Sequence, residues 1–343
     1  MEAARRHATQ RNGWVWCALA AVLFGAATPA TKLLVDNVGA VALAGLLYLG
    51  AAAAVAPFAL REQRSKGSGR QRSRLMLAVG FGGGLAPVLL VLALDKTPAG
   101  TVSLFLNLEL VATAVIARVF LQEHIGRRAG LGIVIVVLGG VVLAGTAGAG
   151  IATGALLVAA ACVCWGIDNA ITASLDSYSP SQITLVKGVV AGSVNLLLGI
   201  LLHGLPAAAF VVAALAIGAF GYGLSITMWI TGARLVGAAR GQVIFALAPF
   251  IGAVLAWPVN GDRLTATTVV AFTVSLVGVI VVGTSHHGHV HAHELIEHAH
   301  PMDPSDPHHR SDALEVFSAT QHRHVAFTHE HEHLPDIHHR HNH

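Results

Sequence analysis

The sequence predicts an all-α polytopic membrane protein: ten transmembrane helices as two inverted five-helix repeats, followed by a disordered, histidine-rich C-terminal tail. Of its 343 residues, 54% are hydrophobic and 11% are charged, whereas charged residues make up about 25% of soluble domains. The mean hydropathy is +0.66. Apolar segments long enough to cross a bilayer recur along most of the chain. These observations exclude an ordinary soluble enzyme, a disordered chain and a disulfide-stapled secreted domain.

Ten apolar segments are separated by short stretches that carry charges, Pro or Gly. About 20 apolar residues cross the hydrocarbon core as a helix. Each span should be helical because unpaired backbone groups are not tolerated in lipid. The expected spans are 14–32, 40–60, 75–94, 101–121, 129–147, 152–173, 182–203, 207–230, 241–259 and 265–284.

Charge divides the chain into an apolar, basic body and a polar tail. Residues 1–285 carry eighteen Lys or Arg and nine acids, whereas residues 286–343 carry three Arg, nine acids and eighteen of the 21 histidines. The predicted divisions are a cytoplasmic N-terminus at 1–12, a first repeat at 13–147, a second repeat at 148–284 and the tail at 285–343.

Loop charges predict the orientation. With the N-terminus inside, the inner segments hold thirteen Lys or Arg and the outer segments hold three. Positive residues concentrate on the cytoplasmic side. Because ten spans is an even number, both termini should be cytoplasmic in a bacterial-type inner membrane. The lipid bilayer is therefore the expected environment, and nothing suggests nucleic-acid binding.

The two halves of the body resemble each other. At an offset of 141 residues, Phe24-Gly25 matches Trp165-Gly166, and at an offset of 139 residues Glu123 matches Asp262. Five spans per half is an odd number, so the second half must enter the membrane from the opposite side. Inverted repeats of this kind are a common plan of secondary transporters.

Several motifs resemble the EamA-type repeat of the drug/metabolite transporter superfamily. The first copy runs through 93–100 to Leu108-Glu109, then 120–124 and 130–140, and the second through 235–240, Ala248-Pro249 and Asp262. The resemblance covers about residues 13–284. The family often has Pro just after the position of Glu109, where this chain has Leu110.

This resemblance implies a ten-helix transporter of small solutes with a central cavity between the repeats, lined notably by the fourth and ninth helices. It is fairly specific for fold and general activity but says little about the substrate. A homodimer is one assembly that the sequence leaves open.

Glu109 lies near the middle of its span, too deep to reach the interface. An ionisable side chain there costs about 2.5–3.5 kcal/mol on insertion scales, so it needs a partner or a function. It could carry a coupling proton or contact a cationic substrate, or it could be a structural carboxyl bonded to a neighbouring helix. Thr113 lies at i+4 on the same face, whereas Asn107 lies about 200° around the helix and should serve another contact.

Asp168 and Lys187 lie at similar depths in consecutive spans, and we expect them to form an ion pair. The pair could lock two helices together or rearrange as a gate moves, and Lys187 could instead simply extend to the interface. Asn195, at i+8 from Lys187, lies loosely on the same side. The remaining residues predicted along the pathway are Trp165, Asn169 and Gln242.

Two further patterns indicate packing. Gly80 and Gly84 form a small-xxx-small pair, which typically marks close helix packing. Cys17, Cys162 and Cys164 lie in apolar runs and should be small buried residues.

The tail reads as a metal-binding segment. Neutral imidazole is a good ligand for zinc, nickel and cobalt, and the tail has no Cys for a thiolate site. With little apolar mass, it should lack regular structure until metal binds. The predicted ligands are His286, His287, His289, His291, His293, His329, His331, His333, His338, His339, His341 and His343.

The leading hypothesis is a secondary active transporter that exports a small solute by alternating access and requires no cofactor. One alternative is a divalent metal exporter for Ni, Co or Zn. An alternative of another class is a membrane-anchored metal buffer or sensor, with the tail as its active part. No nucleophile–base or nucleotide-binding motif supports an enzyme or an ATP-driven pump.

Overall fold

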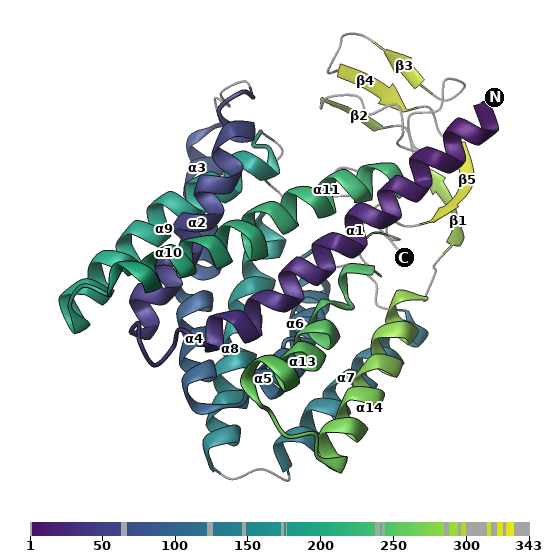
Figure 1. Cartoon of the computed structure of the whole chain (residues 1–343). Helices are drawn as coiled ribbons and strands as arrows, with labels where there is room; N and C mark the ends of the chain where they lie inside the picture. Colours follow the sequence, from purple (N-terminus) through teal and green to yellow (C-terminus); the bar gives the residue numbers. More distant parts are fainter. Residues whose placement is uncertain are drawn as a thin grey trace. The chain divides into compact units, whose positions relative to one another are not determined.

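The computed structural model describes residues 2–62, 67–121, 126–145, 149–172, 175, 177–236, 241, 244–284 and five short strands between 288 and 332. Contacts divide the chain into two units, Met1–Gly283 and Thr284–His343. Figure 1 draws the first as a bundle of helices and the second as strands. Each unit is treated by itself below.

The helical unit follows the apolar segments of the sequence. Within the described residues, nine helical stretches are long and apolar enough to cross a membrane. They are built from α1 (Glu2–Lys32), α2 (Ala40–Ala59), α3 (Gly69–Ala78) with η1 (Val79–Leu85) and α4 (Ala86–Lys96), α5 (Ala99–Phe105) with α6 (Leu108–Ile116) and η2 (Ala117–Leu121), α7 (Arg127–Gly145), α8 (Ala149–Thr172), α9 (Pro180–His203), α10 (Ala208–Ile217) with η3 (Gly218–Leu224) and α11 (Ser225–Val236), and α14 (Ala266–Gly283).

The ninth expected span, 241–259, is described as a shorter helix. Its described part is α13 (Ala248–Asn260), which has 13 residues. A turn at Ala246–Leu247 precedes this helix, and Pro249 stands at its start, where a missing backbone N–H costs least. The described residues therefore show nine helices of spanning length where ten were expected.

The fourth span is broken although it lacks the family's Pro. Its helix is interrupted by a turn at Leu106–Asn107 between α5 and α6. The Asn107 amide donates to the Leu104 carbonyl at 2.9 Å and so satisfies an acceptor that the broken helix would leave open. An asparagine side chain can therefore support this break where Leu110 replaces proline.

Glycines let the helices pack at backbone distance. α2 packs on α9 and α7 packs on α14, and Figure 1 shows each pair side by side. A Cβ added at Gly192 would lie 3.0 Å from the Gly45 carbonyl oxygen, and one at Gly278 would lie 2.9 Å from the Gly132 carbonyl oxygen. Such approaches exclude larger side chains, as is common between membrane helices.

The expected packing role of Gly80 and Gly84 is wrong. A Cβ at Gly80 would meet nothing within 4 Å, whereas Gly82 and Gly83 lie against neighbouring helices. Both predicted glycines fall in η1, a π-helical turn. A π turn changes the angle between successive residues, so the i, i+4 rule no longer selects one face. The three cysteines, by contrast, are buried and unpaired, as predicted.

The tail unit contains five strands: β1 (Gly288–His293), β2 (Ile296–Ala299), β3 (Leu314–Val316), β4 (Gln321–His324) and β5 (Phe327–Glu332). β1 pairs antiparallel with β5, and β4 lies between β2 and β3. The expectation of a tail without regular structure is therefore wrong for these segments. Histidine alternates with other residues in β1 and β5, and period-two alternation suits a strand.

Candidate functional site

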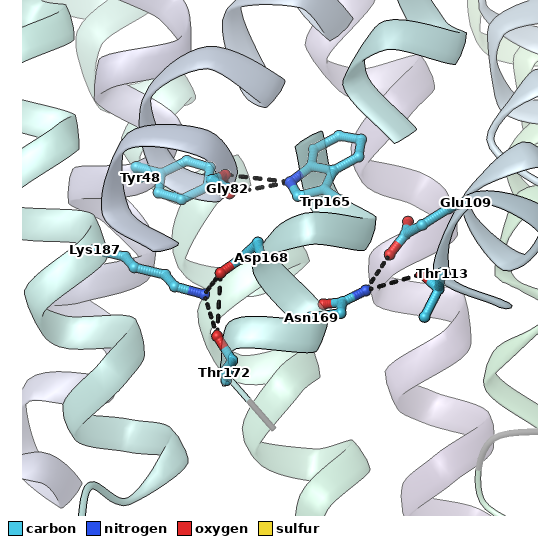
Figure 2. A network of polar contacts seen from close by, with 9 residues as sticks. All are labelled: Tyr48, Gly82, Glu109, Thr113, Trp165, Asp168, Asn169, Thr172 and Lys187. Atoms are coloured by element: carbon cyan, nitrogen blue, oxygen red, sulfur yellow. Dashed lines mark hydrogen bonds and ion pairs between the residues drawn. The ribbon is translucent and has the colours of Figure 1, made fainter. Parts of the chain in front are cut away.

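A network of polar contacts joins four spans inside the helical unit. Figure 2 shows its nine residues, which come from α2, η1, α6, α8 and α9. Three side chains of α8, one helical turn apart, each begin a separate branch: Trp165, Asp168 and Asn169. Helix α8 therefore acts as the centre of the network.

The predicted ion pair between Asp168 and Lys187 is present. The Lys187 ammonium lies 2.5 Å from Asp168 Oδ1, and the two side chains are only 8% and 12% exposed for Asp168 and Lys187, respectively. The Thr172 hydroxyl donates to the same carboxylate oxygen at 3.1 Å and accepts from Lys187 at 3.2 Å. A buried charge is tolerated only when paired and hydrogen-bonded, and Thr172 completes that requirement here.

A second branch joins Glu109 to α8. The Asn169 amide donates to Glu109 Oε1 at 3.2 Å and to the Thr113 hydroxyl at 3.4 Å. Glu109 and Thr113 do share a face of α6, as their spacing predicts. Asn169 is exposed, and Glu109 and Thr113 are half-buried. These polar groups can therefore be reached from outside the protein core, unlike the ion pair.

A third branch holds the backbone of η1. The Tyr48 hydroxyl donates to the Gly82 carbonyl at 2.5 Å, and the Trp165 indole N–H donates to the same oxygen at 3.2 Å. A π turn alters the i→i−4 bonding of the helix. The two side chains bond a carbonyl of this turn and fasten α2 and α8 to it.

Gly82 also makes room for the ion pair. A Cβ at this position would overlap the Asp168 carboxylate and lie 2.7 Å from Asp168 Cβ. The matching position 139 residues later is Gly221 in η3, where a Cβ would lie 2.6 Å from the Ala27 Cβ. Ala27 in turn matches Asp168 at the offset of 141. The same glycine contact thus occurs twice, once against a carboxylate and once against a methyl group.

The other predicted residues lie apart from these branches or outside the description. Asn195 is buried and donates to the Gly84 carbonyl at 3.0 Å, so it supports the far end of η1 rather than contacting Lys187. Asn107 supports the helix break, in agreement with its predicted separate contact. Gln242 lies outside the described residues.

Three network residues escaped the sequence analysis: Tyr48, Gly82 and Thr172. Tyr48 carried a usable signal, because a tyrosine hydroxyl in mid-span needs a hydrogen-bond partner. Thr172 lies at i+4 from Asp168, which also places it on the same helix face. Gly82 carried no distinguishing signal, since η1 has four glycines among its seven residues.

Metal ligands do not gather in the helical unit. Across the described part of the chain, no group of three or more His, Cys, Asp or Glu could hold a metal ion. The network offers one accessible carboxylate, with an amide and a hydroxyl beside it. This arrangement can accept a proton or hydrogen-bond a polar solute.

The fold and the network define a class: a multi-pass membrane protein with a polar site built from several spans. The sequence pattern of the EamA-like transporter family matches twice, at residues 11–145 and 152–284. The chain therefore belongs to the EamA-like transporter family and is a membrane transporter of small solutes.

Two similar proteins extend the comparison. An uncharacterized transporter of Methanothermobacter thermautotrophicus is 25% identical over 295 residues, covering 78% of this chain and 85% of the relative. A protein of known crystal structure superposes with a TM-score of 0.55 at 18% identity, covering 81% of this chain and 97% of the other. The second likeness concerns the fold alone.

Proposed function

We propose that the chain exports a small solute across the inner membrane by alternating access, with Glu109 as the coupling or substrate-binding group. The observation that carries this is the Asn169–Glu109 hydrogen bond. Glu109 belongs to the first family match and Asn169 to the second. An accessible carboxylate bonded across the two copies is positioned to respond when one copy moves against the other.

The proposed mechanism uses two inverted halves. Reciprocal packing supports it, since α1 packs on α13 and α8 packs on α6, and these helices exchange places under the sequence offsets. Opposite halves of this kind can exchange conformations and open a shared site to each side in turn. In this proposal the Asp168–Lys187 pair rearranges during the exchange, and both chain termini are cytoplasmic.

The substrate is best found by a paired screen. Cells lacking the gene would be compared with cells expressing the protein for growth and accumulation in metals and metabolites side by side. Reduced accumulation of an organic solute would support the leading proposal. Reduced accumulation of nickel, cobalt or zinc would support metal export instead. No difference across the panel would contradict export.

The histidine-rich tail supports a second function, reversible metal binding. We propose that it binds Zn, Ni or Co and adjusts transport, without being part of the translocation pathway. A chain ending at Thr284 should keep solute flux but lose metal binding. If the shortened chain loses flux whatever the metal supply, the regulatory role is wrong, and a tail that acts as the principal functional part gains support.

A further inference from the structure

The strand register of the tail collects histidines from two distant segments. In the β1–β5 ladder, His289 lies opposite His331 and His291 lies opposite His329. The next pair is His293 and Phe327. Because successive residues of a strand alternate between faces, these six positions share one face of the ladder. Five of the six are histidine.

The opposite face contains no histidine. Its positions are Gly288 with Glu332, Val290 with Glu330, and Ala292 with Thr328. The separation is complete over the six paired positions of each strand. A one-residue slip would place histidine opposite glutamate, valine or alanine, so the histidine face depends on this register.

Cross-strand histidine pairs suit a transition metal. Directly opposed residues in an antiparallel ladder have Cβ atoms about 4.5–5.5 Å apart, which lets two imidazoles reach one ion. Two adjacent pairs offer up to four nitrogen ligands. Nitrogen ligands without thiolates suit zinc, nickel, cobalt and copper rather than calcium or magnesium.

The other sheet differs in composition. In it, Arg323 lies between Glu297 and Glu315, an arrangement of alternating charge that needs no metal. Only one histidine pair, His298 with His322, occurs there. The β1–β5 ladder is therefore the stronger candidate among the described strands.

We propose that His289, His291, His329 and His331 form one site for a divalent metal of the zinc, nickel and cobalt group, which fastens β1 to β5. This inference rests on the proposed metal binding of the tail and specifies where it occurs. The metal closes the long connection between the strands. Because a site assembled from distant segments couples metal binding to folding, the ladder should be more stable with metal than without it.

The test uses the full chain, purified in detergent through an affinity tag without histidine and stripped with a chelator. Zinc chloride is titrated by calorimetry, and cobalt chloride by its visible absorption, which reports coordination geometry. The ladder variant replaces His289, His291, His329 and His331 with Ala. A matched control, removing the same number of histidines, replaces His298, His300, His308 and His309 with Ala.

The ladder variant should lose at least about tenfold in affinity for the tightest zinc ion, the scale on which metal sites respond to disrupted ligand shells. It should also lose the cobalt spectrum of a nitrogen-ligand site. The matched control should keep both. The E330Q/E332Q variant, altered on the opposite face, should keep them too.

Two outcomes would overturn the inference in distinguishable ways. Equal losses in the ladder variant and the matched control would show that histidine number, not register, sets the affinity, and tail metal binding would survive. If the full chain binds no more zinc than the chain ending at Thr284, both the ladder site and the proposed metal function of the tail are wrong. Neither result bears on transport by the helical unit.

Discussion

At the residue scale, two carboxylates one turn of chemistry apart have different surroundings. Asp168 is buried and paired with Lys187, whereas Glu109 has no ionic partner among the described contacts and is bonded to the amide of Asn169. A paired carboxylate is held in its charged form by the ammonium. The carboxylate without a counter-charge is the better candidate for taking up and releasing a proton.

Replacing Glu109 tests this assignment. We expect E109Q to abolish proton-coupled flux of the solute found in the screen, because glutamine keeps the hydrogen-bonding shape but cannot exchange a proton. Proton movement would be followed with a pH-sensitive dye in proteoliposomes. The matched control D95N alters an exposed carboxyl at the end of α4 and should transport normally. Unchanged flux and pH dependence in E109Q would refute the coupling role.

Breaking the ion pair should affect stability. D168N leaves the Lys187 ammonium buried without a counter-charge, which costs about 3–5 kcal/mol in comparable buried pairs. The double variant D168N/K187M removes both charges and should recover much of that loss. Thermal unfolding of the four proteins in detergent measures the coupling. Additive losses would show that the two side chains do not depend on each other.

At the element scale, η1 and η3 are glycine-rich π turns at matching positions of the two family copies. They share Phe81 with Phe220, Gly82 with Gly221 and Leu85 with Leu224 in the sequence. The carbonyls of η1 are bonded by Tyr48, Trp165 and Asn195 from other helices. Those of η3 are bonded by Ser225 and Thr227 of the helix that follows it. Only η1 is fastened to its neighbours by these side chains.

Alanine substitutions separate the crowded and the open glycine of η1. G82A would force Asp168 away from η1 and should lower stability by about 1–3 kcal/mol, as overpacking does. G80A is the matched control, because a Cβ there meets nothing within 4 Å. It should be neutral or slightly stabilising. Thermal unfolding of both variants tests this, and equal effects would contradict the close approach of Gly82 and Asp168.

At the scale of the whole molecule, the two copies are chemically unequal. Asp168, Lys187 and Asn195 in the second copy correspond to Ala27, Leu46 and Ala54 in the first at the offset of 141. The polar contacts therefore concentrate on one side of the proposed exchange. We expect the opening that separates Asp168 from Lys187 to require breaking an ion pair, whereas the matching opening near Ala27 separates only apolar groups.

The inverted arrangement makes a prediction about sidedness. In a chain whose three native cysteines are replaced by alanine, E62C should be shielded from a membrane-impermeant maleimide added to intact cells, and D95C should react. Glu62 follows α2 on the proposed cytoplasmic side, and Asp95 lies at the far end of the next span. Labelling after lysis controls for reactivity. The reverse pattern would invert the proposed orientation.

By itself, the sequence determined the membrane class, the approximate spans and the residues that need a partner. Apolar length and the cost of buried charge are local properties, so Glu109 with Thr113 and Asp168 with Lys187 could be paired from spacing and depth alone. The tertiary structure alone decided which backbone groups those side chains meet. The π turn of η1 shifts the faces of its glycines, and the bonds of Tyr48 and Trp165 to Gly82 join three helices. Helical periodicity within one segment cannot encode contacts that depend on how separate helices cross.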